Sequence, residues 1–178
     1  LRYKMKIGFI GLGNVGGKLA GSLLRNGFDL TVRDLNQEIA RPFLDEGAKW
    51  GESPKEMTEN SDLIITCLPN PEASATVMEA DDGVLAGISH GKVWAEMSTT
   101  DEEEVKRLGK MVHELGGEAL DCPVSGGCHR AATGNISIFV GGERSSFEKI
   151  LPVMKVLGRR ILHTGALGSA SVLKVMTN

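Results

Sequence analysis

Short apolar runs alternate with amphipathic segments along this chain of 178 residues. The apolar runs predict buried strands at 6–10, 30–33, 63–67, 92–96, 118–121, 136–140 and 160–163. Apolar positions three and four residues apart predict helices at 14–26, 37–46, 101–115 and 143–156, with another beginning at Gly168. Pro42 and Pro152 are expected to distort the helices that contain them. Because strands alternate with helices across short loops, the pattern predicts an α/β fold with a doubly wound, mainly parallel sheet.

A glycine-rich segment follows the first predicted strand and opens the first predicted helix. This glycine loop, Gly11-Leu12-Gly13-Asn14-Val15-Gly16, matches the G-x-G-x-x-G pattern of Rossmann-type dinucleotide-binding turns. Gly11 would permit the tight turn, Gly13 would let a pyrophosphate approach the backbone, and Gly16 would let the helix pack on the strand. Such glycines can also serve a tight strand-to-helix turn alone, but their position between strand and helix favours a dinucleotide whose phosphates face the helix N-terminus.

Asp34 lies at the end of the next predicted strand, 21 residues after Gly13. Its carboxylate is placed to accept hydrogen bonds from the adenosine ribose hydroxyls and would repel a 2′-phosphate, which favours NAD over NADP. Arg33 is the counter-argument, because an arginine can receive that phosphate. Adjacent strand residues point to opposite faces of a sheet, so we expect Arg33 to point away from the site.

Composition excludes several classes of function. The net charge of −3 comes without a basic patch, so nucleic acid is not an expected partner. No apolar stretch approaches the ~20 residues of a membrane span, and the first residues lack the pattern of a signal peptide, so a cytoplasmic location is expected. The three cysteines, Cys67, Cys122 and Cys128, are too few and too widely spaced to indicate a disulfide framework or a metal site.

Two later segments are candidates for chemistry. The Ser125 turn, Ser125-Gly126-Gly127, follows a predicted strand and offers a hydroxyl and backbone N–H groups that suit a small carboxylate. Its spacing alone is equally compatible with a purely structural turn. Lys174 and Asn178 are four residues apart and share one face of the last predicted helix, although a single helical lysine is more often a solvated surface residue.

These segments together resemble the β-hydroxyacid dehydrogenases, the family of 3-hydroxyisobutyrate dehydrogenase-like and tartronate semialdehyde reductase-like enzymes, along essentially the whole chain. The motifs that carry the resemblance are, in order, Gly8 to Gly16, Leu68-Pro69, Ser98-Thr99, Asp121 to Gly127, Ala131 to Asn135, Gly141-Gly142, and Gly168 with Lys174 and Asn178. Three features depart from the usual pattern: Val15 replaces a methionine, Glu96 replaces an aspartate, and Cys128-His129-Arg130 replaces small or apolar residues. Arg130 would either add charge near the substrate or lie in solvent, and solvent is slightly favoured.

The resemblance implies an NAD-dependent oxidoreductase that transfers a hydride between the nicotinamide and a small β-hydroxy acid or its semialdehyde. Lys174 would be the general acid/base, and Asn178 would hold the substrate or the lysine in register. Ser125, Gly126 and Gly127 would bind the substrate carboxylate, whereas Cys128 and His129 would have no catalytic role. The implied cofactor contacts are Gly11, Leu12, Gly13, Asn14, Val15, Gly16, Asp34, Leu68, Pro69 and Thr99.

The resemblance also predicts how the chain is organised. Residues 1–164 would form the NAD-binding domain, and residues 165–178 would begin the interdomain helix. Family members continue into an all-helical domain that closes the active site and forms much of the dimer interface. We expect that domain to be missing here, so the chain alone would bind cofactor without turnover, while its parent protein would be a homo-oligomer.

Two alternatives remain open. The related 6-phosphogluconate dehydrogenases also combine a Ser-Gly-Gly turn with a helical lysine, but they carry a histidine where this chain has Thr177. A Rossmann domain that binds cofactor without catalysis is the second alternative, and the retention of Lys174 argues against it. The residues do not decide which hydroxy acid is the substrate or in which direction the reaction runs.

Overall fold

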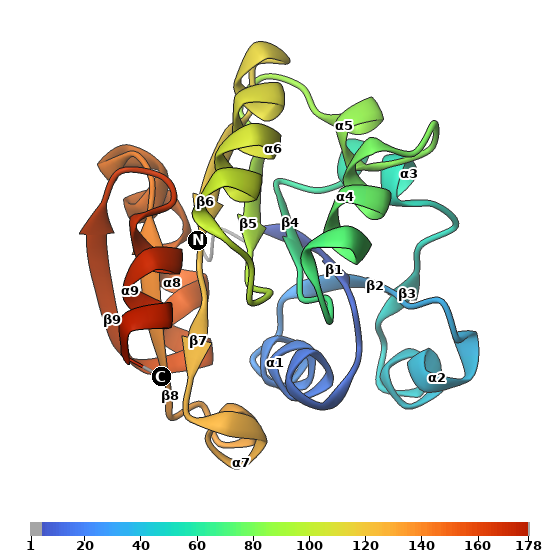
Figure 1. The fold of residues 1–178 in the computed structure, drawn as a ribbon. Helices are drawn as coiled ribbons and strands as arrows, with labels where there is room; N and C mark the ends of the chain where they lie inside the picture. The colour runs from blue at the N-terminus through green and yellow to red at the C-terminus, as the bar shows by residue number, and fades with distance from the viewer. Residues whose placement is uncertain (1–4, 178) are drawn as a thin grey trace.

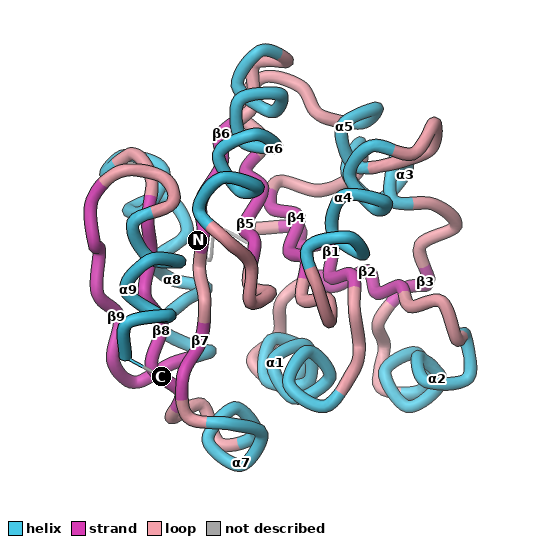
Figure 2. Tube along the Cα trace, in the orientation of Figure 1, coloured by secondary structure: helices cyan, strands magenta, loops and turns pink. Residues whose placement is uncertain are grey.

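The computed structural model describes residues 5–177 and arranges them as one nine-stranded sheet with helices on both faces (Figures 1 and 2). The strands are β1 (Lys6–Ile10), β2 (Asp29–Arg33), β3 (Lys49–Trp50), β4 (Leu63–Thr66), β5 (Val93–Glu96), β6 (Glu118–Asp121), β7 (Val124–Ser125), β8 (Ile136–Gly141) and β9 (Gly158–Gly165). The helices are α1 (Asn14–Arg25), α2 (Gln37–Asp45), α3 (Pro54–Glu59), α4 (Pro71–Glu79), α5 (Val84–Gly87), α6 (Glu102–Glu114), α7 (Gly127–Ala132), α8 (Arg144–Leu157) and α9 (Ser169–Thr177).

The order of the strands confirms the predicted doubly wound, mainly parallel sheet. The order is β3-β2-β1-β4-β5-β6-β8-β7, with β9 paired to β8. The pairs from β3 to β6 are all parallel, whereas β8 runs antiparallel to β6 and β7. The direction of winding reverses between β1 and β4, and in such sheets ligands bind outside the carboxyl ends of the strands at that point.

Every predicted strand and helix forms within one or two residues of its expected bounds, but several short elements were not predicted. Helices α3 and α4 begin with Pro54 and Pro71, and the side chains of Ser53 and Asn70 accept hydrogen bonds from their first turns. A capping residue followed by proline is a helix-start signal. The segment at Val124–Ser125, interpreted as part of a turn, is a short strand against β8.

The two internal prolines do not interrupt their helices. Helix α2 continues through Pro42 from Gln37 to Asp45, and α8 continues through Pro152 from Arg144 to Leu157. The proline ring removes one backbone donor in each helix. The apolar faces of both helices, which include Ala40 in α2 and Ile150 in α8, nevertheless pack into the core.

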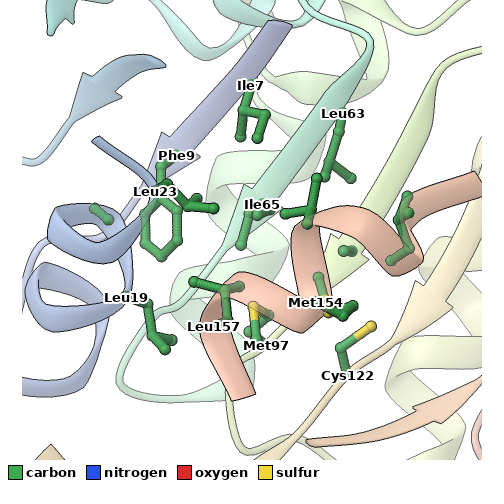
Figure 3. Close-up of a cluster of buried hydrophobic side chains, with 14 of the residues drawn as sticks. Ile7, Phe9, Leu19, Leu23, Leu63, Ile65, Met97, Cys122, Met154 and Leu157 are labelled. Carbon is green, nitrogen blue, oxygen red and sulfur yellow. The ribbon is translucent and has the colours of Figure 1, made fainter. Parts of the chain in front are cut away.

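Two apolar layers cover the sheet, because side chains alternate along each strand. On β1 and β4, Ile7, Phe9, Leu63 and Ile65 belong to one layer, which packs against α1 and α8 and is drawn in Figure 3. Their neighbour Ile64 belongs to the other layer, together with residues of α3, α5 and α6. The central strands are therefore buried on both faces and hold the carboxyl end of β1 in a fixed position.

Candidate functional site

The carboxyl ends of β1, β4 and β5 open onto a cavity of about 1000 Å³. Residues from widely separated parts of the chain line it. The predicted site residues among them are Gly11, Gly13, Asn14, Val15, Gly16, Asp34, Leu68, Pro69, Thr99, Gly126, Gly127 and Lys174. The structure thus brings the glycine loop, the glycines of the Ser125 turn and the lysine to one cavity.

The three glycines of the glycine loop have different surroundings. Gly11 has a φ of +104°, and a Cβ placed on it would lie 2.2 Å from the carbonyl oxygen of Cys67. A Cβ on Gly16 would lie 2.1 Å from the carbonyl oxygen of Gly11, so this glycine lets α1 pack against the loop. Around Gly13, by contrast, no heavy atom lies within 4 Å of such a Cβ. The loop is therefore tightly packed on the protein side and open at Gly13.

Asp34 is held by the glycine loop itself. Its Oδ2 accepts a hydrogen bond from the backbone N–H of Leu12 at 2.9 Å, and its Oδ1 accepts one from the N–H of Asn36 at 3.1 Å. A carboxylate has about four lone-pair positions, so each oxygen keeps the capacity to accept a further donor. The carboxylate thus ties the end of β2 to the loop while it borders the cavity.

Arg33 also borders the cavity, which was not expected from the alternation of side chains along a strand. Its Nη1 donates to the carbonyl oxygens of Gly51 and Glu52 at 2.7 and 3.0 Å. The guanidinium also lies over the ring of Trp50, 5.3 Å from its centroid. The prediction that Arg33 points away from the site is therefore wrong in so far as the residue borders the cavity, but its guanidinium is directed to the backbone of Gly51 and Glu52.

Among the predicted site residues that the structure describes, Leu12 and Ser125 do not line the cavity. The side chain of Leu12 is buried in the core, at 4% exposure, so only its backbone is available at the loop. Ser125 lies between Val124 and Gly126, which do line the cavity, and alternation along β7 places its side chain on the opposite strand face from Val124. Asn178 lies outside the described residues.

A buried polar network supports the loops that carry Leu68 and Thr99. The Ser98 hydroxyl accepts a hydrogen bond from the backbone N–H of Leu68 at 2.6 Å. Glu96, fully buried at the end of β5, accepts hydrogen bonds from the N–H of Ser98 and the hydroxyl of Thr66, both at 3.0 Å. Burial raises the pKa of Glu96, and the surrounding donors offset part of that rise. Glu96, which replaces the aspartate usual in the family, is therefore a structural acid beneath the cavity.

The two more buried cysteines are poor nucleophiles. Burial, with a smaller effect from the nearby Glu96 carboxylate, raises the pKa of the Cys67 thiol to about 12. Burial also raises the pKa of Cys122 well above its ordinary value. Because the thiolate is the reactive form, both side chains act as apolar packing groups at neutral pH.

Asp121 anchors the helix that carries Lys174. This fully buried carboxylate accepts hydrogen bonds from the N–H of Gly168 at 2.9 Å and from the N–H and hydroxyl of Ser171 at 2.8 and 2.9 Å. These donors belong to the first turn of α9 and the residue before it, where the helix dipole favours a negative charge. Lys174 follows Ser171 by three residues, so Asp121 fixes the turn from which the lysine extends.

Sequence reasoning missed Asp121 and Ser98 as supporting residues, and it missed the apolar wall of the cavity. Leu35, Ile39 and Val77 line the cavity, and the side chain of Leu35 is fully exposed. The sequence does show a leucine directly after the strand-end acid, which is a signal for an apolar contact beside Asp34. The hydrogen bonds of Asp121 had no comparable signal, because its partners are 47 and 50 residues away.

Residues 5–177 contain no helix that combines the length and apolar character needed to cross a membrane. Over the same range, no three His, Cys, Asp or Glu side chains form a group that could hold a metal ion.

Comparison with known proteins gives consistent similarities. Residues 6–165 match the family described as the NAD binding domain of 6-phosphogluconate dehydrogenase. The chain is 34% identical to rat (Rattus norvegicus) mitochondrial 3-hydroxyisobutyrate dehydrogenase over 98% of its length, and 36% identical to 2-(hydroxymethyl)glutarate dehydrogenase of Eubacterium barkeri, also over 98%. It spans 52% and 58% of those two relatives. The structure of 3-hydroxyisobutyrate dehydrogenase from Mycobacterium tuberculosis with L-serine superposes with a TM-score of 0.90 at 27% identity, covering 98% of this chain and 59% of that one.

Proposed function

The chain belongs to the family of NAD-binding domains described for 6-phosphogluconate dehydrogenase, as an N-terminal domain of the β-hydroxyacid dehydrogenases, and from this membership we propose a function for the whole protein. It transfers a hydride between NAD and a small β-hydroxy acid or its semialdehyde, with Lys174 as general acid/base. The observation that carries this proposal is that Lys174, Gly126 and Gly127 line the same cavity as the glycine loop.

The glycine loop fits a dinucleotide. Gly13 offers open space at the start of α1, and that helix has neither a side-chain cap nor an acidic residue in its first turn. Its first N–H groups therefore remain available to a pyrophosphate, which the positive end of the helix dipole also attracts. A bound nicotinamide dinucleotide supplies the hydride acceptor or donor.

The preference for NAD rests on Asp34. Its carboxylate borders the cavity and would repel a 2′-phosphate, while the guanidinium of Arg33 is already engaged by the carbonyl oxygens of Gly51 and Glu52. These two bonds use both hydrogens of Nη1 and fix the direction of the side chain, so that only Nε and Nη2 of Arg33 are left to meet a 2′-phosphate. The expected result is that the chain binds NADH at least ~10-fold more tightly than NADPH, a difference of about 1.4 kcal/mol. Equal affinities in a fluorescence titration would contradict the preference.

Lys174 moves the proton of the reaction. In oxidation its neutral Nζ accepts the hydroxyl proton as the hydride leaves carbon, and in reduction the ammonium returns that proton to the carbonyl oxygen. The backbone N–H groups of the Ser125 turn bind the substrate carboxylate and so direct the reacting oxygen toward Lys174. Asn178 holds the substrate or the lysine in register.

Substitution of the lysine tests the reaction. Lys174→Ala in the whole protein lowers kcat at least ~100-fold, the usual scale for loss of a general acid/base. The matched control is Lys110→Ala on the exposed face of α6, which leaves kcat unchanged. Near-normal turnover of Lys174→Ala with short β-hydroxy acids would contradict the role. Turnover of 6-phosphogluconate without turnover of small hydroxy acids would replace the proposed substrate class.

A further inference from the structure

A second cavity, of about 620 Å³, is markedly basic. Arg130 of α7 and Arg159 and Arg160 of β9 line it, together with His129 and three neutral polar residues. No acidic residue lines it, and within residues 5–177 none of these arginines forms an ion pair. Guanidinium groups in such an arrangement repel one another and offer paired donors to an anion with planar or tetrahedral oxygens.

The register of the sheet connects this basic cavity to the Ser125 turn. Ser125 on β7 pairs with Ser137 on β8, and Ser137 pairs with Arg160 on β9. Residues paired across neighbouring strands have side chains on the same face, so these three form one row. Neighbouring strands lie about 4.8 Å apart, which places the Cα atoms of Ser125 and Arg160 about 10 Å from each other, within the combined reach of an arginine and a short ligand.

The face that carries this row is the one over which α9 runs. Gly141 follows Ser137 by four residues on the same face of β8. It lies against Ala166, in the loop before α9, and against Asp121, which accepts hydrogen bonds from the start of that helix. Figure 1 shows α9 alongside β8 and β9, with α8 on the other side of these strands. Ser125, the basic cavity and the helix of Lys174 are therefore on the same side of this part of the sheet.

Arg130 borders the Ser125 turn directly. A Cβ placed on Gly126 would lie 2.9 Å from Cδ of Arg130, so the stem of the arginine lies over that glycine. Gly126 itself lines the cavity that contains Lys174. The side chain of Arg130 therefore stands at the boundary between the basic cavity and the proposed reaction site.

We propose that the basic cavity binds a second acidic group of the substrate, a carboxylate or a phosphate, while the first carboxylate lies at the Ser125 turn. This inference rests on the proposed function and narrows its substrate class to hydroxy acids with two anionic groups. Arg160 and Arg130 are the specificity-determining residues. They act on substrate affinity and not on the proton transfer by Lys174.

Titration of the isotope-labelled, NADH-loaded chain with three probes tests the proposal by NMR. Glutarate carries two carboxylates and butyrate carries one. Inorganic phosphate is a single anion without a carboxylate. Glutarate binds at least ~10-fold more tightly than butyrate, as one additional charge-assisted contact predicts. Glutarate shifts the amide signals of Gly126, Gly127, Ser137 and Arg160, whereas butyrate shifts only those of the two glycines.

Two variants and a control locate the effect. Arg160→Ala and Arg130→Ala each reduce the preference for glutarate to less than threefold and leave NADH affinity unchanged. Arg41→Ala, which removes an exposed arginine of α2 paired with Glu38, changes neither quantity. The proposal is overturned by equal binding of glutarate and butyrate, by a preference that survives both variants, or by phosphate binding without any dicarboxylate preference. Failure of the unmodified chain to bind NADH would overturn the proposed function instead.

Discussion

The glycine loop and α9 border the same cavity but are held in place by different means. The loop depends on the close backbone contact at Gly16 and on Asp34, both within one strand-helix-strand unit, and on the approach of Gly11 to the carbonyl oxygen of Cys67 after β4. Helix α9 depends on Asp121, a buried acid from a strand 47 residues earlier in the chain. The hydrogen bond between Asp34 and the loop is thus local, whereas the lysine is positioned by long-range hydrogen bonds, and the two regions should respond differently to substitution.

The largest effect is expected for Asp121→Ala. The change leaves the N–H groups of Gly168 and Ser171 buried without an acceptor and removes a charge that favours the helix N-terminus. We expect a loss of about 3–5 kcal/mol in the free energy of unfolding, since several hydrogen bonds to one charged group are removed together. Urea denaturation followed by circular dichroism measures it.

Two further variants sharpen that result. Asp121→Asn keeps one acceptor oxygen and should lose about half as much stability as Asp121→Ala, because hydrogen bonds to a neutral group are weaker. Asp81→Ala, an exposed acid in the loop after α4, serves as the control and should change stability by less than about 0.5 kcal/mol. A fall for Asp121→Ala no larger than that of the control would show that α9 is held by its apolar contacts alone.

The contrast explains which parts of the molecule could be predicted from the sequence. Glycine spacing, a strand-end acid and apolar periodicity are local signals, so the loop, Asp34 and the longer elements could be predicted. Helices α3 and α4 also carry a local signal in the sequence, a serine or asparagine before proline. The row of Ser125, Ser137 and Arg160 could not be predicted, because it depends on β8 entering the sheet antiparallel to β7 and parallel to β9.

The second prediction separates binding from stability within the glycine loop. Gly13 has an ordinary φ of −69° and open space around it, so Gly13→Ala should change the free energy of unfolding by less than about 0.5 kcal/mol. The added methyl group occupies the position that the pyrophosphate would approach. NADH affinity should therefore fall at least ~10-fold, or about 1.4 kcal/mol, in a fluorescence titration.

Gly16→Ala is the matched comparison for that experiment. Its Cβ would meet the carbonyl oxygen of Gly11, so this variant should lose stability and NADH binding together. Unchanged NADH affinity in Gly13→Ala would mean that the dinucleotide does not pass over this glycine. A large loss of stability in the same variant would mean that the loop is not open there.

The smallest effect concerns Glu96, which lies beneath both halves of the cavity. Burial raises its pKa above the ordinary value of 4.5, so the folded state holds the proton more tightly than the unfolded chain does. Its contribution to stability is complete below the unfolded pKa and is lost as the pH rises toward the folded pKa. Glu96→Gln keeps an oxygen to accept from Thr66 and Ser98, and should therefore be more stable than the unmodified chain at pH 8, with little difference near pH 4.5.

Denaturation at several pH values tests the direction of this pH dependence, and an acid whose pKa is lowered in the folded state provides the comparison. The hydrogen bond from Arg107 lowers the pKa of Glu104 on the surface of α6. Glu104→Gln should therefore reduce stability at neutral pH and have less effect as the pH falls. If Glu96→Gln behaved in the same direction as Glu104→Gln, the pKa of Glu96 would be lowered in the folded protein, and the hydrogen bonds from Thr66 and Ser98 would outweigh the effect of burial.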